Sequence, residues 1–104
     1  MGIVHVLAII TVKPGMRDRV LEALRANVPA VRAEAGCIEY GATVDAEGAG
    51  AIQTRLGADT FVVVEKWESL EALKAHAAAP HMAAYAARVK GMLASRVIHV
   101  LSAV

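Results

Sequence analysis

Three side chains in one stretch of the sequence have the chemistry needed for proton transfer beside an aromatic ligand. Glu65 and Trp67 end an apolar segment, and His76 lies in the helix-like segment that follows. A histidine titrates near neutral pH and can act as a general base, whereas an indole ring combines an apolar wall with an N–H donor. These residue types indicate a site at a strand–helix junction, where small domains often carry functional side chains.

Each of the three residues also has a purely structural interpretation. Trp67 and Glu65 share one face of an extended strand, where the indole could simply hold a helix against the sheet. His76 borders an apolar helical stripe, and a histidine there is usually half-exposed and hydrogen-bonded to a neighbour. Glu65 interrupts an apolar strand, so its burial would require a partner or a raised pKa. Arg88 or a histidine is a better candidate for this partner than Lys66, which points to the opposite face.

Further candidates lie in the last helical segment and in the second strand. His81, Tyr85 and Arg88 recur at helical spacing and form one line along a helix. Such a polar line either borders a cleft or marks the solvent boundary. Arg88 could stabilise an anionic substrate or form a surface ion pair. Tyr40 could donate its hydroxyl group to a ligand or serve a structural role.

The same residues argue against a metal site or a nucleotide cofactor. His76 and His81 are not at the i, i+4 spacing that puts two histidines on one helical face, and Pro80 separates them. The sequence contains no glycine-rich phosphate-binding motif. Cys37 lacks an adjacent base, so we expect an inert thiol. We therefore predict no metal and no cofactor.

Apolar periodicity predicts the elements that position these residues. Strand-like patterns cover Ile3–Lys13, Cys37–Asp45, Thr60–Glu68 and Arg96–Ala103, and helical spacing covers Met16–Ala35, 69–79 and 80–93. Pro29 should kink the first helix or divide it into two pieces. Gly36 fits its C-terminal cap, and Ser69 fits the N-cap of the second helix. The order predicts an α+β fold, a ferredoxin-like βαββαβ sandwich with helices on one face of the sheet.

The strands indicate that the protein forms an oligomer. The first and third strands are apolar on both alternating faces, whereas a one-sided antiparallel sheet should alternate apolar with polar residues. Hydrophobic residues make up 57% of the chain, more than one small domain is expected to bury. Because the helices can cover only one face, we predict a homodimer in which the two sheets pack face to face.

Length and charge narrow the possible partners and locations. The chain of 104 residues corresponds to a single domain, 1–104. It has 11 basic and 10 acidic residues without a basic cluster, which argues against nucleic acid. The apolar run Ile3–Ile10 is too short to span a bilayer, so we expect no membrane partner. The lone Cys37 suits a reducing compartment, and we expect a cytoplasmic protein.

Two motifs resemble those of a known family, the ABM domain (antibiotic biosynthesis monooxygenase, quinol monooxygenase-like). One is Glu65-x-Trp67-x-Ser-x-Glu-Ala-Leu-x-Ala-His76, followed by Pro80-His81. The other is Ala35-Gly36-Cys37-Ile-Glu-Tyr40, which is similar to that family's Pro-Gly-Cys-x-x-Tyr with alanine in place of proline. Together with Lys13-Pro14-Gly15 before the first helix, the resemblance covers essentially the whole chain.

The resemblance implies a dimeric α/β barrel of ferredoxin-like subunits, each with a pocket between sheet and helices. Characterised members oxidise quinols or polyketide anthrones with O2, without metal or flavin. We therefore expect a cofactor-independent monooxygenase whose partners are a small aromatic substrate and O2. His76 would be the base and Trp67 the pocket wall and donor. The expected substrate-binding residues are Tyr40, Glu65, His81, Tyr85 and Arg88.

Two other functions stay open. Some relatives bind and degrade haem, which needs only one axial histidine, but they carry an asparagine on the first strand, where this chain has His5, Ala8 and Ile9. A non-catalytic dimeric module that binds small molecules is the other alternative. Aromatic residues make up only 4% of the chain, which gives this alternative some weight.

Overall fold

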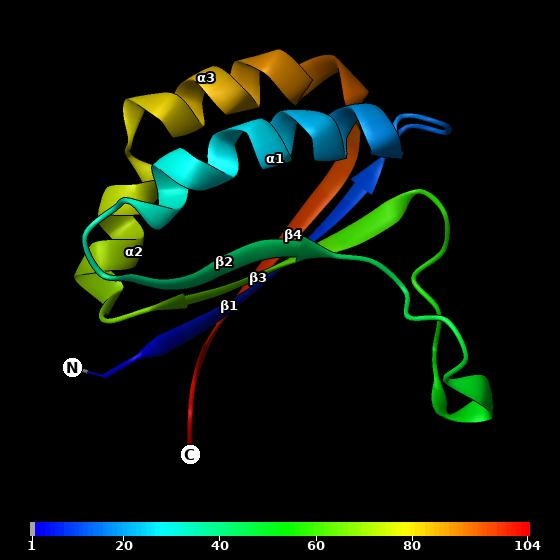
Figure 1. The fold of residues 1–104 in the computed structure, drawn as a ribbon, viewed down its shortest axis with the longest axis horizontal. Helices are drawn as coiled ribbons and strands as arrows, with labels where there is room; N and C mark the ends of the chain where they lie inside the picture. The colour runs from blue at the N-terminus through cyan, green and yellow to red at the C-terminus, as the bar shows by residue number, and fades with distance from the viewer. Residues whose placement is uncertain (1) are drawn as a thin grey trace.

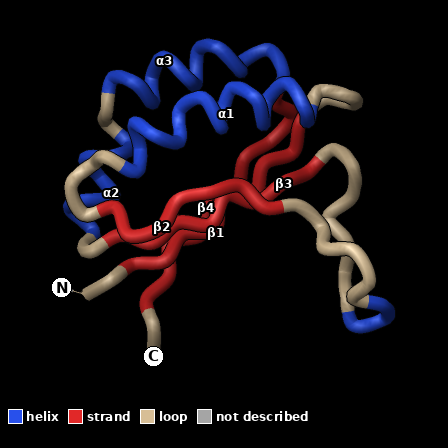
Figure 2. The backbone as a smooth tube through the Cα atoms, in the orientation of Figure 1, coloured by secondary structure: helices blue, strands red, loops and turns tan. Residues whose placement is uncertain are grey.

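A four-stranded antiparallel sheet with helices on one face forms the described part of the chain. The computed structural model describes residues 2–104. The elements in chain order are β1 (Val4–Val12), α1 (Arg17–Arg32), β2 (Cys37–Thr43), β3 (Thr60–Trp67), α2 (Leu70–Ala77), α3 (Pro80–Val89) and β4 (Leu93–Ser102). The strands lie in the order β2-β3-β1-β4. Figure 1 and Figure 2 show α1 and α3 packed together above the sheet, with α2 at one end. This arrangement confirms the predicted ferredoxin-like fold.

The central strands β1 and β3 bury every second residue. Both have a strictly alternating burial pattern, because successive side chains of a strand point to opposite faces. In β3 the buried residues are Phe61, Val63, Glu65 and Trp67. The helices cover this face, and an acidic residue is therefore built into the wall of the hydrophobic core.

The first helix differs from the prediction in two details. A single helix runs through Pro29 to Arg32, so the alternative of two helical pieces is wrong. Pro29 lies in the last turn, where its missing N–H removes one hydrogen bond, and the fully buried Val31 still anchors that turn to the core. The helix ends at a cap on Ala33 rather than at Gly36. Gly36 instead lies in the following turn, with a left-handed φ of +84°.

The second and third helices begin as predicted. The Ser69 side chain accepts a hydrogen bond from the backbone N–H of Ala72 at 3.1 Å, which makes Ser69 the N-cap of α2. Pro80 occupies the first turn of α3, where a proline loses no helical hydrogen bond. The short connection between the two helices starts α3 at the end of the sheet where α2 lies (Figure 1).

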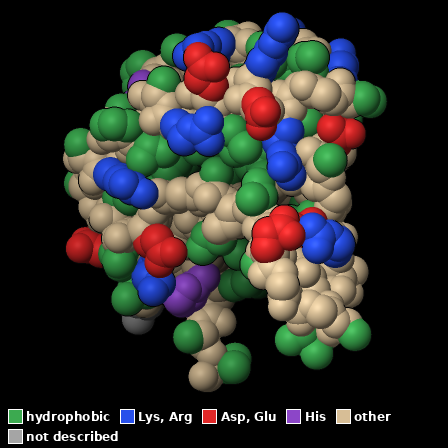
Figure 3. All heavy atoms as spheres, turned by 45° about the vertical axis from the view of Figure 1, so that its right-hand side comes forward, with side chains coloured by type: hydrophobic (Ala, Val, Ile, Leu, Met, Phe, Trp, Pro, Cys, Tyr) green, Lys and Arg blue, Asp and Glu red, His purple; other side chains and the backbone are tan. Residues whose placement is uncertain are grey.

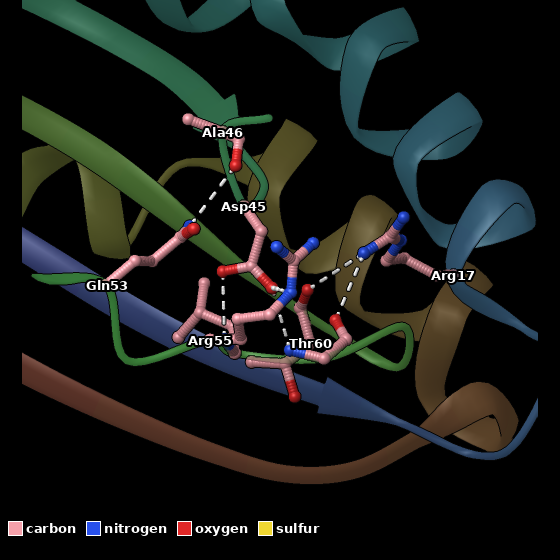
Figure 4. A network of polar contacts seen from close by, with 8 residues as sticks. Arg17, Asp45, Ala46, Gln53, Arg55 and Thr60 are labelled. Atoms are coloured by element: carbon pink, nitrogen blue, oxygen red, sulfur yellow. Dashed lines mark hydrogen bonds and ion pairs between the residues drawn. The ribbon is translucent and has the colours of Figure 1, made fainter. Parts of the chain in front are cut away.

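A loop between β2 and β3 projects away from the helices (Figure 1). Figure 4 shows the contacts that shape its base. The Asp45 carboxylate accepts hydrogen bonds from the backbone N–H groups of Leu56 and Gly57 at 2.8 and 2.9 Å. These bonds lower the pKa of Asp45 below its usual value. Arg17 donates to the carbonyls of Gly57 and Thr60, which ties the loop to α1.

Charged side chains are dispersed on the face of the molecule drawn in Figure 3. There, basic and acidic side chains alternate over the surface, with apolar side chains visible between them. Among residues 2–104, no helix is long and apolar enough to cross a bilayer.

The turn at Gly36 generates a stability prediction. A Cβ atom at this position would lie 2.6 Å from the Cβ of Ala72, and the left-handed φ adds strain. We expect Gly36→Ala to lower the free energy of unfolding by roughly 2–4 kcal/mol, since the strain adds to the clash with α2. Urea denaturation followed by circular dichroism would measure this change.

Gly15→Ala is the matched control. Gly15 also has a left-handed φ, +78°, but nothing lies within 4 Å of its added Cβ. Its cost should be limited to the conformational strain, about 1 kcal/mol. Equal losses of unfolding free energy for the two variants would show that the clash with Ala72 does not destabilise Gly36→Ala.

Candidate active site

A cavity of about 570 Å³ lies between the sheet and the helices, and most of its wall is apolar. Its floor comes from alternate residues of the strands, such as Val6, Ala8 and Val63. Its roof comes mainly from α2 and α3. The polar or charged side chains on its wall are Tyr40, Glu65, His76, Tyr85, Lys90 and Arg96. The cavity therefore combines an apolar interior with a few polar groups, as small-molecule sites commonly do.

His76 lies on the cavity wall between two carboxylates. It is only 4% exposed, although a histidine that borders an apolar helical stripe is usually partly exposed. Its Nδ1 lies 2.9 Å from Oε2 of Glu34. Its Nε2 lies 4.0 Å from Oε1 of Glu65. An ionised carboxylate can only accept a hydrogen bond, so an ionised Glu34 would hold the proton on Nδ1 and leave Nε2 as the free base of a neutral ring.

Aromatic rings pack against His76 on two sides. The Trp67 ring centroid is 4.7 Å away with the planes tilted by 34°. The Tyr40 ring meets the imidazole edge-on at 5.5 Å and 61°. These contacts restrict the rotation of the imidazole, so its two nitrogens keep their separate partners.

Glu65 is the buried carboxyl group of the site. Burial raises its pKa above the usual value, and the nearby Glu34 raises it further. The Trp67 N–H donates to Oε1 of Glu65 at 3.0 Å, and this hydrogen bond opposes the rise in the pKa, as does the nearby His76. The partner that the sequence required for a buried Glu65 is therefore supplied by Trp67 and His76, and not by Arg88.

Two phenol groups on the wall keep their protons at neutral pH. Burial is the main cause that raises the pKa of Tyr40, with Glu65 and Tyr85 adding to it. Burial likewise raises the pKa of Tyr85, although Arg96 opposes the rise. Both hydroxyl groups can thus act as hydrogen-bond donors to an oxygen of a bound ligand.

Three of the predicted site residues lie away from the cavity wall. Trp67 is completely buried behind Glu65 and His76, so its indole is not a wall of the cavity. His81 and Arg88 line a smaller hollow between α1 and α3, in which Tyr85 also takes part. The predicted polar line on α3 is therefore divided, because Tyr85 borders both the large cavity and the hollow, whereas His81 and Arg88 border only the hollow.

The sequence matches the model of the family described as antibiotic biosynthesis monooxygenase over residues 3–88. The chain is 38% identical over 98 residues to "Probable quinol monooxygenase YgiN" of Escherichia coli K12, covering 92% of this chain and 93% of that protein. The chain belongs to the antibiotic biosynthesis monooxygenase (ABM) family. This finding confirms the resemblance drawn from the two sequence motifs.

Solved structures share the fold of this chain. The protein PA3566 of Pseudomonas aeruginosa superposes with a TM-score of 0.82 at 27% identity, covering 100% of this chain and 96% of that one. Rv0793 of Mycobacterium tuberculosis gives a TM-score of 0.80 at 28% identity, covering 99% of this chain and 96% of that one. Membership in the ABM family supports a monooxygenase activity in general terms.

Glu34 is the residue of this ABM site that the sequence did not reveal. It follows α1 in an irregular turn, and its Oε2 lies 3.0 Å from Nε2 of His81 as well as next to His76. The His81 contact lacks hydrogen-bond geometry, and neither ring nitrogen of His81 has a hydrogen-bond partner within residues 2–104. Glu34 therefore connects the end of α1 to both α2 and α3, with His76 as its well-aligned partner.

The acidic and histidine side chains of the site do not form a metal-binding group. Within the described residues, no three His, Cys, Asp or Glu side chains gather in a way that could hold a metal ion. Burial and the carboxylates of Glu34 and Glu65 raise the pKa of the Cys37 thiol, so this side chain stays protonated at neutral pH.

The raised pKa of Glu65 generates a prediction for the pH dependence of stability. Below the usual carboxyl pKa, Glu65 is protonated in both the folded and the unfolded chain. As the pH rises, Glu65 ionises first in the unfolded chain, so the folded state loses stability. Glu65→Gln cannot ionise and can still accept from Trp67. Relative to the wild type, we expect this variant to gain roughly 1 kcal/mol or more as the pH rises above the usual carboxyl pKa.

Urea unfolding at several pH values would measure this difference. Glu22→Gln, at an exposed position of α1, provides the control and should follow the wild-type curve. Parallel pH profiles for Glu65→Gln and the wild type would mean that Glu65 is not penalised by its burial.

Proposed function

We propose that this protein is a cofactor-independent monooxygenase that oxidises a quinol, or a related electron-rich aromatic such as an anthrone, with O2. The observation that carries the proposal is the buried His76, whose Nδ1 is held by Glu34 at 2.9 Å on the wall of an apolar cavity. The 38% identity to a probable quinol monooxygenase supports the same reaction class.

His76 would begin the reaction as the general base. With its Nδ1 proton held by Glu34, the imidazole can accept a phenolic or activated C–H proton at Nε2. Glu34 would stabilise the resulting imidazolium, in the way that a carboxylate commonly orients a catalytic histidine. Substrate deprotonation is the step that needs the enzyme, because the anion is a much stronger reductant than the neutral quinol.

The anion would then react directly with O2. One electron passes to O2, and the substrate radical and superoxide combine to form a carbon–oxygen bond. Protonation gives a hydroperoxide, and cleavage of its O–O bond with loss of water leaves one oxygen atom as a new carbonyl group. In total, O2 accepts four electrons from the substrate, so one oxygen atom enters the product and the other leaves as water.

The remaining polar groups of the cavity would stabilise the oxygen atoms that gain negative charge. Tyr40 and Tyr85 keep their hydroxyl protons and can donate to the phenolate oxygen of the substrate. Trp67 would act one step further away, because its N–H holds the Glu65 carboxyl group at 3.0 Å. His81 and Arg88 lie in the neighbouring hollow and would affect the substrate only through α3.

We also propose that the protein acts as a homodimer that packs through its sheet faces. The face opposite the helices carries apolar residues that are directly paired across strands, such as Leu7 with Val64 and Ile9 with both Val62 and Val97. Val97 is 48% exposed in the single chain. A second copy of the sheet would remove this surface from water.

Replacing the base tests the proposed reaction. We expect His76→Ala to lower the rate of O2 consumption with a naphthoquinol by roughly a hundredfold or more, because the substrate loses its proton acceptor. Trp67→Phe and Glu34→Gln should cause smaller losses, roughly tenfold, since they only loosen the groups around the imidazole. An oxygen electrode would record the rates.

Lys74→Ala is the control on the same helix, at an exposed position, and should keep the wild-type rate. An active wild type whose rate is unchanged in His76→Ala would exclude His76 as the base. Absence of O2 consumption, combined with a Soret shift on adding haem, would instead favour the haem-binding alternative.

A charge on the sheet face tests the dimer. We expect Val97→Glu to convert a dimer into a monomer at micromolar concentration, because the glutamate would have to be buried without a partner. Ile52→Glu makes a similar change at a residue that is 93% exposed on the projecting loop, and should stay dimeric. Sedimentation velocity would give the masses, and a monomeric wild type would disprove the proposed assembly.

A further inference from the structure

We propose that the end of the cavity lined by Lys90 and Arg96 binds an anionic group of the substrate. The substrate would then be a phenol or quinol that carries a carboxylate, or an equivalent acidic group, on the part of the molecule farthest from the ring that is oxidised. The substrate class rests on the proposed function, whereas the anion-binding end can be tested without any turnover.

The register of the sheet separates Arg96 from the His76 end of the cavity. Glu65 pairs with Val6 on one side of β1, and Arg96 pairs with Ile10 on the other side. Val6 and Ile10 are four residues apart, so the two pairs are separated by roughly 13 Å along the strand. Glu65 and Arg96 therefore lie near opposite ends of the cavity.

The same register turns Arg96 toward the helices. Directly opposed residues of an antiparallel pair point to the same face. Ile10 and Ala8 face the cavity, and their partners Arg96 and Ile98 line it as well. Lys90 follows α3 directly and lines the same cavity.

These two cations have no structural partner. Arg17 and Arg32 donate hydrogen bonds to backbone carbonyls and so hold the fold together. Among residues 2–104, Lys90 and Arg96 take part in none of the side-chain hydrogen bonds or ion pairs. Two unpaired cations at one end of an apolar cavity would attract an acidic group of a ligand.

The charges give the cavity a direction. The Glu34 carboxyl group lies behind His76 at one end, and Lys90 and Arg96 line the other end. An acidic substituent would be repelled at the His76 end and attracted at the other, while apolar residues such as Val63 and Ile98 contact the rings. The substrate would thus enter in one orientation only.

Three naphthalene ligands that are stable to air test the proposal by isothermal titration calorimetry. 6-Hydroxy-2-naphthoate has its carboxylate on the ring away from the hydroxyl group, 1-hydroxy-2-naphthoate has it beside the hydroxyl group, and 2-naphthol has none. We expect 6-hydroxy-2-naphthoate to bind roughly tenfold more tightly than 2-naphthol, with a gain that falls as salt is added, and 1-hydroxy-2-naphthoate to show no gain.

The double variant K90Q/R96Q should lose this gain and bind 2-naphthol as the wild type does. R19Q/K74Q removes the same charge from exposed positions outside the cavity and should keep the gain. Equal affinities for 6-hydroxy-2-naphthoate and 2-naphthol, or no binding of 6-hydroxy-2-naphthoate, would overturn the proposal. An equal gain for 1-hydroxy-2-naphthoate, or a gain that survives in K90Q/R96Q, would also overturn it.

The oxygen assay separates the two proposals. If the naphthoquinol is oxidised but the distal carboxylate gives no gain in affinity, the anion-binding end is wrong and the monooxygenase proposal stands. If the gain is present and depends on Lys90 and Arg96 while no quinol is oxidised, the monooxygenase proposal is the one that fails.

Discussion

The contact between Glu34 and His76 is the interaction on which the rest of the site depends. It joins the turn after α1 to the middle of α2 at 2.9 Å, and it decides which imidazole nitrogen carries the proton. Trp67 and Tyr40 then pack against the same ring. Without the Glu34 carboxylate, the imidazole could rotate or change its tautomer, and the nitrogen near Glu65 would no longer be defined as a base.

This cluster is placed in a position that is unfavourable for folding. Burial raises the pKa of Glu65, which means that the fold disfavours its charged form. The hydrophobic core offsets the cost of burying Glu65, because the alternating burial of β1 and β3 packs a largely apolar face against the helices. Perturbed groups of this kind are common where chemistry takes place, since a site tuned for proton transfer is seldom the most stable arrangement.

The sequence predicted the fold well because its signals are local. Runs of apolar residues, Ser69 and Pro80 each act within a few residues of their own position, and the predicted strands and helices lie within a few residues of the observed bounds. Glu34 gave no such signal, because its importance comes only from α1, α2 and α3 meeting at one point. The same limit explains why Trp67 was expected on the cavity wall. Its strand face was predicted correctly, but its position behind Glu65 depends on how α2 lies over the sheet.

Arg88 and Arg96 show how register can separate residues of similar chemistry. Helical spacing grouped Arg88 with Tyr85, but the turn of α3 leaves Arg88 over the hollow next to α1. Arg96 lies in a strand whose own pattern is almost entirely exposed, so nothing local marks it as part of a cavity. Only its pairing with Ile10 turns it inward. A function that needs an anion-binding end opposite a base therefore depends on the pairing of β1 with β4 as much as on the residues that perform the chemistry.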